Sequence, residues 1–134
     1  MMKIEVPAIL VNLEKMTDFT ASFAEKQGFD KATVGQIRLA SEEALVNVIN
    51  YAYPGAEGTV EIACEEIQGG GIKIEIKDAG IPFDPLSLPS PDTSLPMEQR
   101  NIGGLGIFMI RKIMTSVKYR RENDRNILTL TKLH

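Results

Sequence analysis

Two polar side chains four residues apart, Glu43 and Asn47, are the first candidates for chemistry in this chain. Within a helix this spacing places both on one face, and Asn50 lies about one further turn along. A carboxylate and an amide oxygen stacked in this way suit a Mg²⁺ ion that keeps most of its water ligands. The carboxylate could instead polarise an attacking hydroxyl group. A polar stripe facing solvent would show the same pattern, so the spacing alone leaves these interpretations open.

A second candidate is the segment 78–85 (DAGIPFDP), which directly follows an alternating apolar run at 72–77. The carboxylate of Asp78, at the end of a predicted strand, is well placed to accept a hydrogen bond from an amino group of a ligand. Gly80 lacks a side chain, so the backbone there can approach a flat ring. Asp, Gly and Pro are also common turn residues, and the segment alone is typical of an ordinary turn as well.

A third candidate is the glycine-rich segment 100–107 (RNIGGLGI), which leads into a predicted helix. Its glycines are Gly103, Gly104 and Gly106, with Leu105 between the last two. At a helix start, unpaired N–H groups and the positive end of the helix dipole favour an anion such as phosphate. Arg100 could add a second positive charge beside that phosphate. A glycine cluster at a helix start is weak evidence when it stands alone.

In this order along the chain, the three segments predict a nucleotide site. The helix supplies a base and a Mg²⁺ ligand, the strand end an acceptor for adenine, and the glycines a phosphate site. Residues 85–102 hold four of the seven prolines and show no hydrophobic periodicity. Loops of that length in a compact domain are usually functional or disordered, so we expect a mobile lid over the site. Neither the P-loop nor the Rossmann glycine pattern is present, which predicts a different geometry.

Hydrophobic periodicity predicts the elements that must position these residues. Helices are expected at 9–27, 31–51 and 107–115, and strands at 3–7, 59–67, 72–77, 117–122 and 126–132. Asp30 is a plausible N-cap for the second helix, and residues 123–125 a turn between the last two strands. The pattern predicts an α+β fold: a two-layer sandwich with helices on one face of a mixed, mostly antiparallel sheet. Residues 1–134 are expected to form a single domain.

Composition excludes several classes of protein. Hydrophobic residues make up 43% of the 134 residues, too many for a disordered chain. The net charge of −3 argues against direct nucleic-acid binding. Residues 111–134 nevertheless carry seven Lys and Arg against two Asp and Glu. That basic end could contact an acidic partner or a phosphate, although an ordinary solvated face has the same composition.

The sequence also bears on cellular location. No stretch approaches the ~18 apolar residues of a membrane span, and the first residues do not resemble a secretory signal. The single cysteine, Cys64, cannot form an internal disulfide and lies in an alternating run typical of core packing. We therefore expect a cytoplasmic protein that does not bind membranes.

The three segments resemble the N, G1 and G2 boxes of the GHKL superfamily of ATPases. The matching motifs are Glu43-Ala-Leu-Val-Asn47, Asp78-Ala-Gly80 and Gly104-Leu-Gly106. Within that superfamily the chain is similar to the anti-sigma factor serine kinases of bacterial sporulation and general stress response. The segments 78–86 (DAGIPFDPL) and 103–110 (GGLGIFMI) carry this resemblance, which extends from about Ile4 to Leu133. It implies the Bergerat ATP-binding fold, a histidine-kinase-like sandwich.

The resemblance implies a role for each matching residue. Glu43 would be the general base, Asn47 the Mg²⁺ ligand and Asp78 the acceptor of the adenine amino group. The remaining binding residues would be Gly80 and Pro82 at the adenine pocket, Gly103, Gly104, Leu105 and Gly106 at the phosphates, and Arg100 at the outer phosphate. Pro82 stands where the family usually has a second glycine, which implies altered pocket detail rather than loss of binding. The only histidine, His134, is terminal, so histidine autophosphorylation is excluded.

Members of this family phosphorylate a serine on a small anti-anti-sigma (STAS-type) partner and hold a sigma factor in an alternate complex. The resemblance thus implies an ATP- and Mg²⁺-dependent serine/threonine protein kinase that regulates transcription by partner switching. It also implies a possible homodimer. The alternative is a nucleotide-responsive binding module of the same fold without effective kinase activity.

Overall fold

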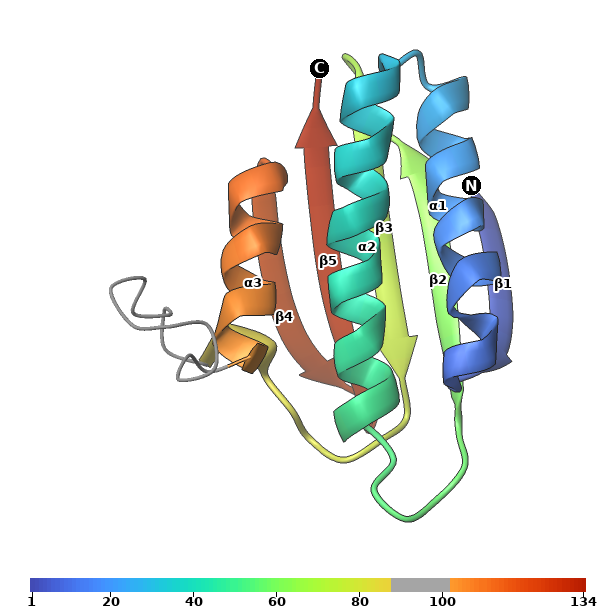
Figure 1. Cartoon of the computed structure of the whole chain (residues 1–134), viewed down its shortest axis with the longest axis vertical. Helices are drawn as coiled ribbons and strands as arrows, with labels where there is room; N and C mark the ends of the chain where they lie inside the picture. The colour runs from blue at the N-terminus through green and yellow to red at the C-terminus, as the bar shows by residue number, and fades with distance from the viewer. Residues whose placement is uncertain (88–101) are drawn as a thin grey trace.

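The computed structural model describes residues 1–87 and 102–134, apart from the side chains of residues 102–105. Three α-helices cover one face of a five-stranded sheet in the described part of the chain (Figure 1). The helices are α1 (Leu13–Lys26), α2 (Lys31–Tyr51) and α3 (Ile102–Ile113). The strands are β1 (Met2–Pro7), β2 (Thr59–Glu66), β3 (Gly71–Asp78), β4 (Ser116–Glu122) and β5 (Arg125–Leu133). The predicted α+β sandwich is confirmed.

The strand order is β1-β2-β3-β5-β4, and every neighbouring pair is antiparallel. The expected mixed sheet therefore does not occur among the described strands. The reason lies in the last connection: α3 carries the chain from β3 to β4, which run in the same direction. Strand β5 then inserts between them and pairs antiparallel with both.

Alternation along the strands decides which side chains face the helices. In β3, Ile72, Ile74 and Ile76 are buried in the core, and Asp78 continues the same period-two series at the strand's end. Asp78 pairs in register with Asn126 of β5, which is also buried. Strand geometry thus places a carboxylate and an amide together at one end of an otherwise apolar interface.

The other face of the sheet is polar. Glu75 on β3 lies between Lys77 of its own strand, at 4.0 Å, and Arg120 of β4, at 3.5 Å. Arg120 also contacts Glu122, 3.0 Å away. Part of the basic C-terminal charge is therefore offset by carboxylates of the same sheet, as an ordinary solvated face would show.

The first two helices differ in how well the sequence predicts their starts. The Asp30 carboxylate accepts a 2.7 Å hydrogen bond from the Thr33 N–H, which confirms the predicted N-cap of α2. By contrast, α1 begins at Leu13, and Leu10–Asn12 form a separate 3₁₀ turn. The Asn12 side chain donates to the Pro7 carbonyl at 2.9 Å, which ties this turn back to β1. The prediction of one helix from residue 9 is wrong because of that local contact.

Helix α3 begins earlier than predicted. It runs from Ile102 to Ile113 rather than from 107 to 115, so the glycine cluster lies inside its first turns and not before them. Glycine disfavours a helix by up to about 1 kcal/mol per residue, yet here α3 packs directly against α2. Tertiary contact thus overrides the local preference. Of the predicted lid, Pro85–Ser87 form a short 3₁₀ turn and residues 88–101 lie outside the described residues.

Two further expectations concern Cys64 and the membrane. Cys64 is fully buried in β2, and burial raises the pKa of its thiol to about 12, as expected for a packing residue. None of the helices in the described part of the chain combines the length and apolar character needed to span a bilayer.

Candidate nucleotide-binding site

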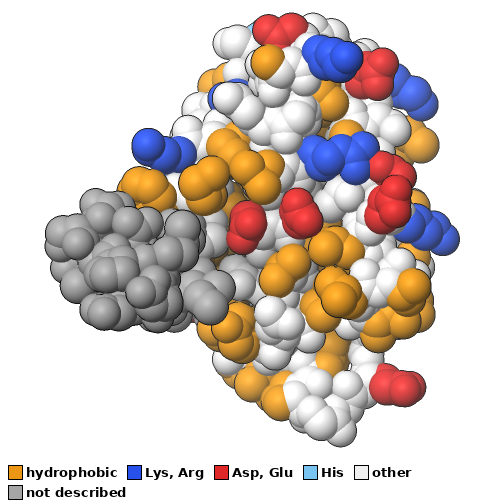
Figure 2. All heavy atoms as spheres, in the orientation of Figure 1, with side chains coloured by type: hydrophobic (Ala, Val, Ile, Leu, Met, Phe, Trp, Pro, Cys, Tyr) orange, Lys and Arg blue, Asp and Glu red, His pale blue; other side chains and the backbone are white. Residues whose placement is uncertain are grey.

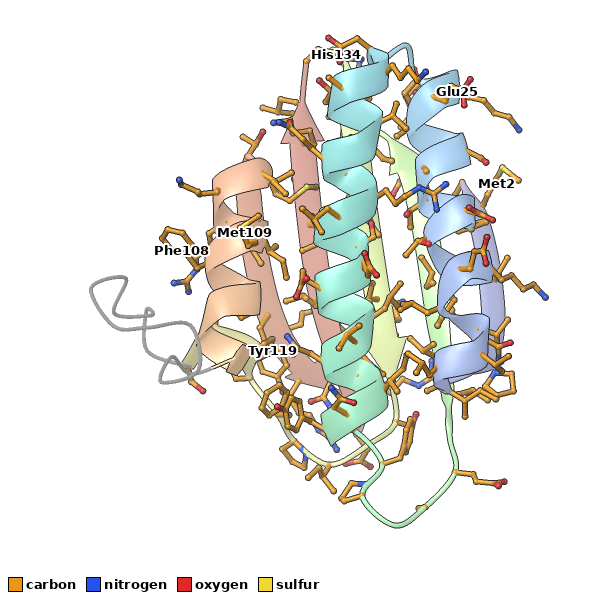
Figure 3. All side chains as sticks on the ribbon, in the orientation of Figure 1. Met2, Glu25, Phe108, Met109, Tyr119 and His134 are labelled. Carbon is orange, nitrogen blue, oxygen red and sulfur yellow. The ribbon has the colours of Figure 1, made fainter. Side chains whose placement is uncertain are left out.

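A small pocket lies where the C-terminal half of α2 crosses the ends of β3, β4 and β5. Its polar lining residues are Asn47, Asp78, Tyr119 and Asn126, and its apolar ones Ala44, Val48, Ala52, Ile76, Phe83, Pro85 and Leu128. Tyr119, labelled in Figure 3, lies between the lower ends of α2 and α3 in that view. The pocket volume of about 30 Å³ has room for little more than a water molecule. A larger ligand would have to move part of the wall.

Asp78 is held at the floor of this pocket through one of its two oxygens. Its Oδ1 atom accepts 2.9 Å hydrogen bonds from the Gly80 N–H and from Nδ2 of Asn126. Only 6% of Asp78 is exposed. The Oδ2 atom has no partner among the described residues, so it is the oxygen available to a ligand.

Gly80 is required by a close approach of two backbones. A Cβ atom at this position would collide with the carbonyl group of Ala52, the residue after α2. The neighbouring Ile81 N–H donates to that carbonyl at 2.9 Å. The close approach expected at Gly80 is therefore present, but its partner is the end of α2.

Asn47 contributes the one buried side-chain donor without a hydrogen-bond partner among the described residues. The residue is 8% exposed and lines the pocket together with Asp78. An unpaired buried donor costs about 1–3 kcal/mol of folding free energy. That cost is offset when a ligand or water accepts from Nδ2, so the pocket carries one unpaired donor and one free acceptor.

Glu43 lies one helical turn before Asn47 and faces α3 instead of the pocket. Its Oε2 atom is 3.0 Å from where a Cβ atom at Gly106 would lie. The side chain is half-buried, and desolvation, with a smaller contribution from the Glu42 charge, raises the pKa of its carboxyl group. A carboxylate with a raised pKa is a stronger proton acceptor, and this one lies beside Gly106 of α3.

The remaining predicted site residues fall into three groups. Pro82 is exposed and lies outside the pocket, in a neighbouring groove with Ile81 and Arg121. Gly103, Gly104 and Leu105 belong to the first turn of α3, at the same end of the molecule as the C-terminus of α2 (Figure 1). Arg100 lies outside the described residues.

An aromatic pair lies at the edge of the pocket. The rings of Tyr51 and Phe83 stack with their centroids 5.1 Å apart. Phe83 lines the pocket, whereas Tyr51, at the end of α2, is 40% exposed. The pair therefore connects the pocket wall to the surface of the molecule.

Figure 2 shows exposed hydrophobic side chains over much of this face of the molecule. Beside the pocket are Tyr51, stacked on Phe83, and Ile81, bonded to the Ala52 carbonyl, and the consecutive residues Ile9, Leu10 and Val11 precede α1. All five are at least 40% exposed. Hydrophobic side chains exposed together are typical of a surface that contacts another protein.

The residues present fit a hydrated Mg²⁺ ion, but not a metal held by protein ligands alone. No group of three or more His, Cys, Asp or Glu side chains in the described ranges could hold a metal. Mg²⁺ bound with phosphates needs only one or two protein oxygens. Asn47, which lines the pocket, offers one such oxygen, and Glu43 lies one turn earlier on α2, on the side of Gly106.

Sequence comparison finds relatives with kinase names. The chain is 28% identical to the serine/threonine-protein kinase BtrW of Bordetella bronchiseptica over 96 residues, 71% of this chain and 67% of that protein. It is 27% identical to the serine-protein kinase RsbW of Bacillus cereus over 131 residues, 95% of this chain and 80% of that protein.

Solved structures show the same fold at low sequence identity. The SiaB–SiaC complex from Pseudomonas aeruginosa contains a chain that matches with a TM-score of 0.58 and 14% identity, covering 100% of this chain and 90% of that one. The blue-light activated histidine kinase of Erythrobacter litoralis matches with a TM-score of 0.56 and 14% identity. In that case the match covers 92% of this chain and 41% of the kinase.

Residues 6–132 match the histidine kinase-like ATPase domain family. Because this match spans nearly the whole chain, the chain belongs to the family of histidine kinase-like ATPase domains.

Proposed function

We propose that this chain is an ATP-dependent serine/threonine protein kinase that regulates transcription by phosphorylating an anti-anti-sigma protein. The observation that carries the proposal is the arrangement on α2. Asn47, whose Nδ2 has no partner among the described residues, lines the pocket that holds Asp78, while Glu43, one turn earlier, faces Gly106 of α3. In the proposal, the pocket with Asp78 recognises the base, and Glu43, beside Gly106 of α3, accepts the proton.

In this proposal Asp78 accepts from the amino group of adenine through Oδ2, and Asn47 lies between the base and the phosphates. The glycines of α3 and Arg100 bind the phosphates, the glycines through N–H groups at the helix start. Bound Mg²⁺, held by Asn47 with Glu43 nearby, would offset the charge on the transferred phosphoryl group. Glu43 accepts the proton of the substrate serine hydroxyl, a role supported by the raised pKa of its carboxyl group.

Two observations support a protein partner. The relatives BtrW and RsbW are named as serine/threonine- and serine-protein kinases, and SiaB was solved in a complex with SiaC. The exposed hydrophobic residues at the pocket end offer a surface for such a protein. We extend the proposal to a STAS-type substrate, to a sigma factor bound in the alternate complex, and to a homodimer.

The proposal is tested by phosphoryl transfer. The chain is incubated with γ-labelled ATP, Mg²⁺ and each STAS-type protein encoded in the same genome. Wild type and Glu42→Gln are expected to label a serine, while Glu43→Gln binds ATP but does not label. Glu42→Gln is the matched control because it removes the adjacent carboxylate of the same helix.

The other outcomes are also decisive. ATP binding without transfer to any STAS-type protein would favour the alternative, a nucleotide-responsive binding module. Absence of both ATP binding and transfer would refute the proposed function. Equal labelling by wild type and Glu43→Gln would remove Glu43 from the role of general base.

A further inference from the structure

The side-chain amide of Asn126 makes more hydrogen bonds than any other side chain in the described part of the pocket. Nδ2 donates to Oδ1 of Asp78 at 2.9 Å and to the Ile81 carbonyl at 2.7 Å. Oδ1 of Asn126 accepts from the Tyr119 hydroxyl at 2.6 Å, from Arg121 at 3.2 Å and from the Phe83 N–H at 3.3 Å.

These partners leave the amide only one orientation. Both groups facing Nδ2 are acceptors, and the backbone and guanidinium groups facing Oδ1 are donors. Burial is the main cause that raises the pKa of the Tyr119 hydroxyl, so this group stays protonated and also donates. If the amide were flipped, its oxygen would face the Asp78 carboxylate. Its NH₂ group would face the donors of Tyr119, Arg121 and Phe83. The Asn126 amide is therefore held with its NH₂ group towards Asp78.

This orientation has a consequence for Asp78. Hydrogen bonds from Gly80 and Asn126 both fall on Oδ1. They fix the carboxylate and leave Oδ2 as the oxygen that a ligand meets. Where the 6-position of a purine meets Oδ2, the amino group of adenine can donate to it, whereas the 6-oxo group of hypoxanthine or guanine cannot.

We propose that Asn126 is the positioning residue that sets the base preference of the pocket, by holding the Asp78 carboxylate in one orientation with Oδ2 towards the ligand. This inference rests on the proposed ATP-binding function. The same amide also ties the Ile81 carbonyl and the Phe83 N–H to the sheet. Asn126 thus couples recognition of the base to the segment that leads from β3 into the pocket wall.

The test compares binding of ATP and inosine triphosphate (ITP) to wild type and Asn126→Asp by titration calorimetry at several pH values. The substitution keeps the size of the side chain and the acceptor at Oδ1. It replaces the Nδ2 donor by an oxygen facing Asp78. Asn123→Asp is the matched control, because it makes the same chemical change at an exposed turn residue of the same hairpin, away from the pocket.

At pH 8 we expect Asn126→Asp to lose about tenfold in ATP affinity, equivalent to ~1.4 kcal/mol, and to bind ITP within about twofold of wild type. Two facing carboxylates share a proton as the pH falls. The protonated carboxyl can then donate to Asp78 as Nδ2 did. The ATP/ITP ratio of Asn126→Asp should therefore recover between pH 8 and pH 5.5, a profile that a purely structural role would not produce.

The titratable and charged groups around this amide come from three elements. They are Asp78 on β3, Tyr119 and Arg121 on β4, and Asp84 in the segment after β3, which acts on the Tyr119 hydroxyl. All of them are unchanged in Asn123→Asp. Comparing the ATP/ITP ratios of the two variants at each pH therefore isolates the new carboxyl group from titration of the nucleotides.

Three results would overturn the inference. The first is an ATP/ITP ratio in Asn126→Asp that equals the wild-type ratio at every pH. The second is a lowered ATP/ITP ratio that does not recover at pH 5.5. If Asn126→Asp fails to fold, Asn126→Ser replaces it, and the third result is a preserved preference for ATP in that variant. A wild type that binds neither nucleotide refutes the proposed function itself, whereas a wild type that prefers ATP leaves that function intact.

Discussion

The Oε2 atom of Glu43 lies 3.0 Å from the point that a methyl group would occupy at Gly106. One residue is a half-buried carboxylate on α2, and the other is a buried glycine in the third α-helix, α3. The absence of a side chain at Gly106 therefore lets the Glu43 carboxylate lie close against α3. The structure ties the position of the proposed base to a glycine of the proposed phosphate site.

Gly106→Ala is expected to reduce kinase activity without unfolding the protein. The added methyl group displaces the Glu43 carboxylate by a few tenths of an ångström, which we expect to slow phosphoryl transfer by about tenfold. Alanine favours a helix over glycine by up to about 1 kcal/mol, which opposes any loss of stability. Urea unfolding and phosphoryl-transfer rates measure the two effects separately.

Gly35→Ala is the control for this experiment. Gly35 lies in α2, is exposed, and would place its Cβ atom with nothing within 4 Å. We expect it to stabilise the protein by up to about 1 kcal/mol with an unchanged transfer rate. A Gly106→Ala protein as active as Gly35→Ala would show that the 3.0 Å approach has no functional consequence.

Asn47→Leu should separate stability from binding. The substitution removes the unpaired Nδ2 donor and places an apolar side chain in a largely apolar pocket. Replacing an unsatisfied buried polar group by an apolar one of similar size is neutral or stabilising. We therefore expect an unchanged or higher free energy of unfolding, together with loss of the stabilisation that Mg-ATP gives to wild type.

Thermal unfolding with and without Mg-ATP checks this expectation. Wild type should gain about 2.7 kcal/mol when ATP is present at ~100 times its dissociation constant. A large loss of stability in Asn47→Leu would mean that Asn47 has a structural partner instead of serving a ligand.

The raised pKa of Glu43 predicts how stability depends on pH. The folded-state pKa lies above that of the unfolded chain because burial penalises the charged form. The unfolded chain therefore loses the Glu43 proton first as the pH rises. Glu43 destabilises the fold progressively from the unfolded pKa up to the folded one, and below both values this cost is absent.

Glu43→Gln should consequently raise the melting temperature relative to wild type at pH 7, and the difference should shrink as the pH falls towards 4. Glu57→Gln changes an exposed loop carboxylate and serves as control. Melting curves at both pH values measure the effect. A difference that grows on acidification would contradict the assigned direction of the shift.

Some of the site could be predicted from the sequence because it depends on local periodicity. Ile72, Ile74 and Ile76 alternate along one strand, and Asp78 is the next residue in this buried series. This placement does not depend on which strand lies beside it. In the same way, the apolar periodicity of residues 31–51 predicts the helix that carries Glu43 and Asn47 one turn apart. These features need no knowledge of distant parts of the chain.

The rest depends on contacts between distant segments. Asn126 reaches Asp78 only because β5 pairs with β3 in one register, 48 residues apart in sequence. An alternating strand with a polar residue at a buried position was the available signal. The early start of α3 likewise depends on packing against α2. Helix propensities of single residues do not include such a contact.

Cys64 offers a measurement of ligand binding that needs no mutation. Its thiol is fully buried in β2, and burial raises the pKa of the thiol to about 12. The reactive thiolate is therefore scarce in the folded protein, and a thiol reagent at pH 8 should label Cys64 only when the sheet opens. Any ligand that binds only the folded state lowers the open fraction by the factor 1 + [L]/Kd.

Mg-ATP at ~100 times its dissociation constant should thus slow labelling of Cys64 about 100-fold, provided that labelling is slow compared with reclosing. Mg-ITP at the same concentration should slow it much less, because its base has no amino group for Asp78. Asn47→Leu should abolish the effect of ATP while leaving the basal rate unchanged or lower. Rapid labelling in the absence of ligand would instead show that the strand carrying Cys64 opens without global unfolding, and would contradict its place in the stable core.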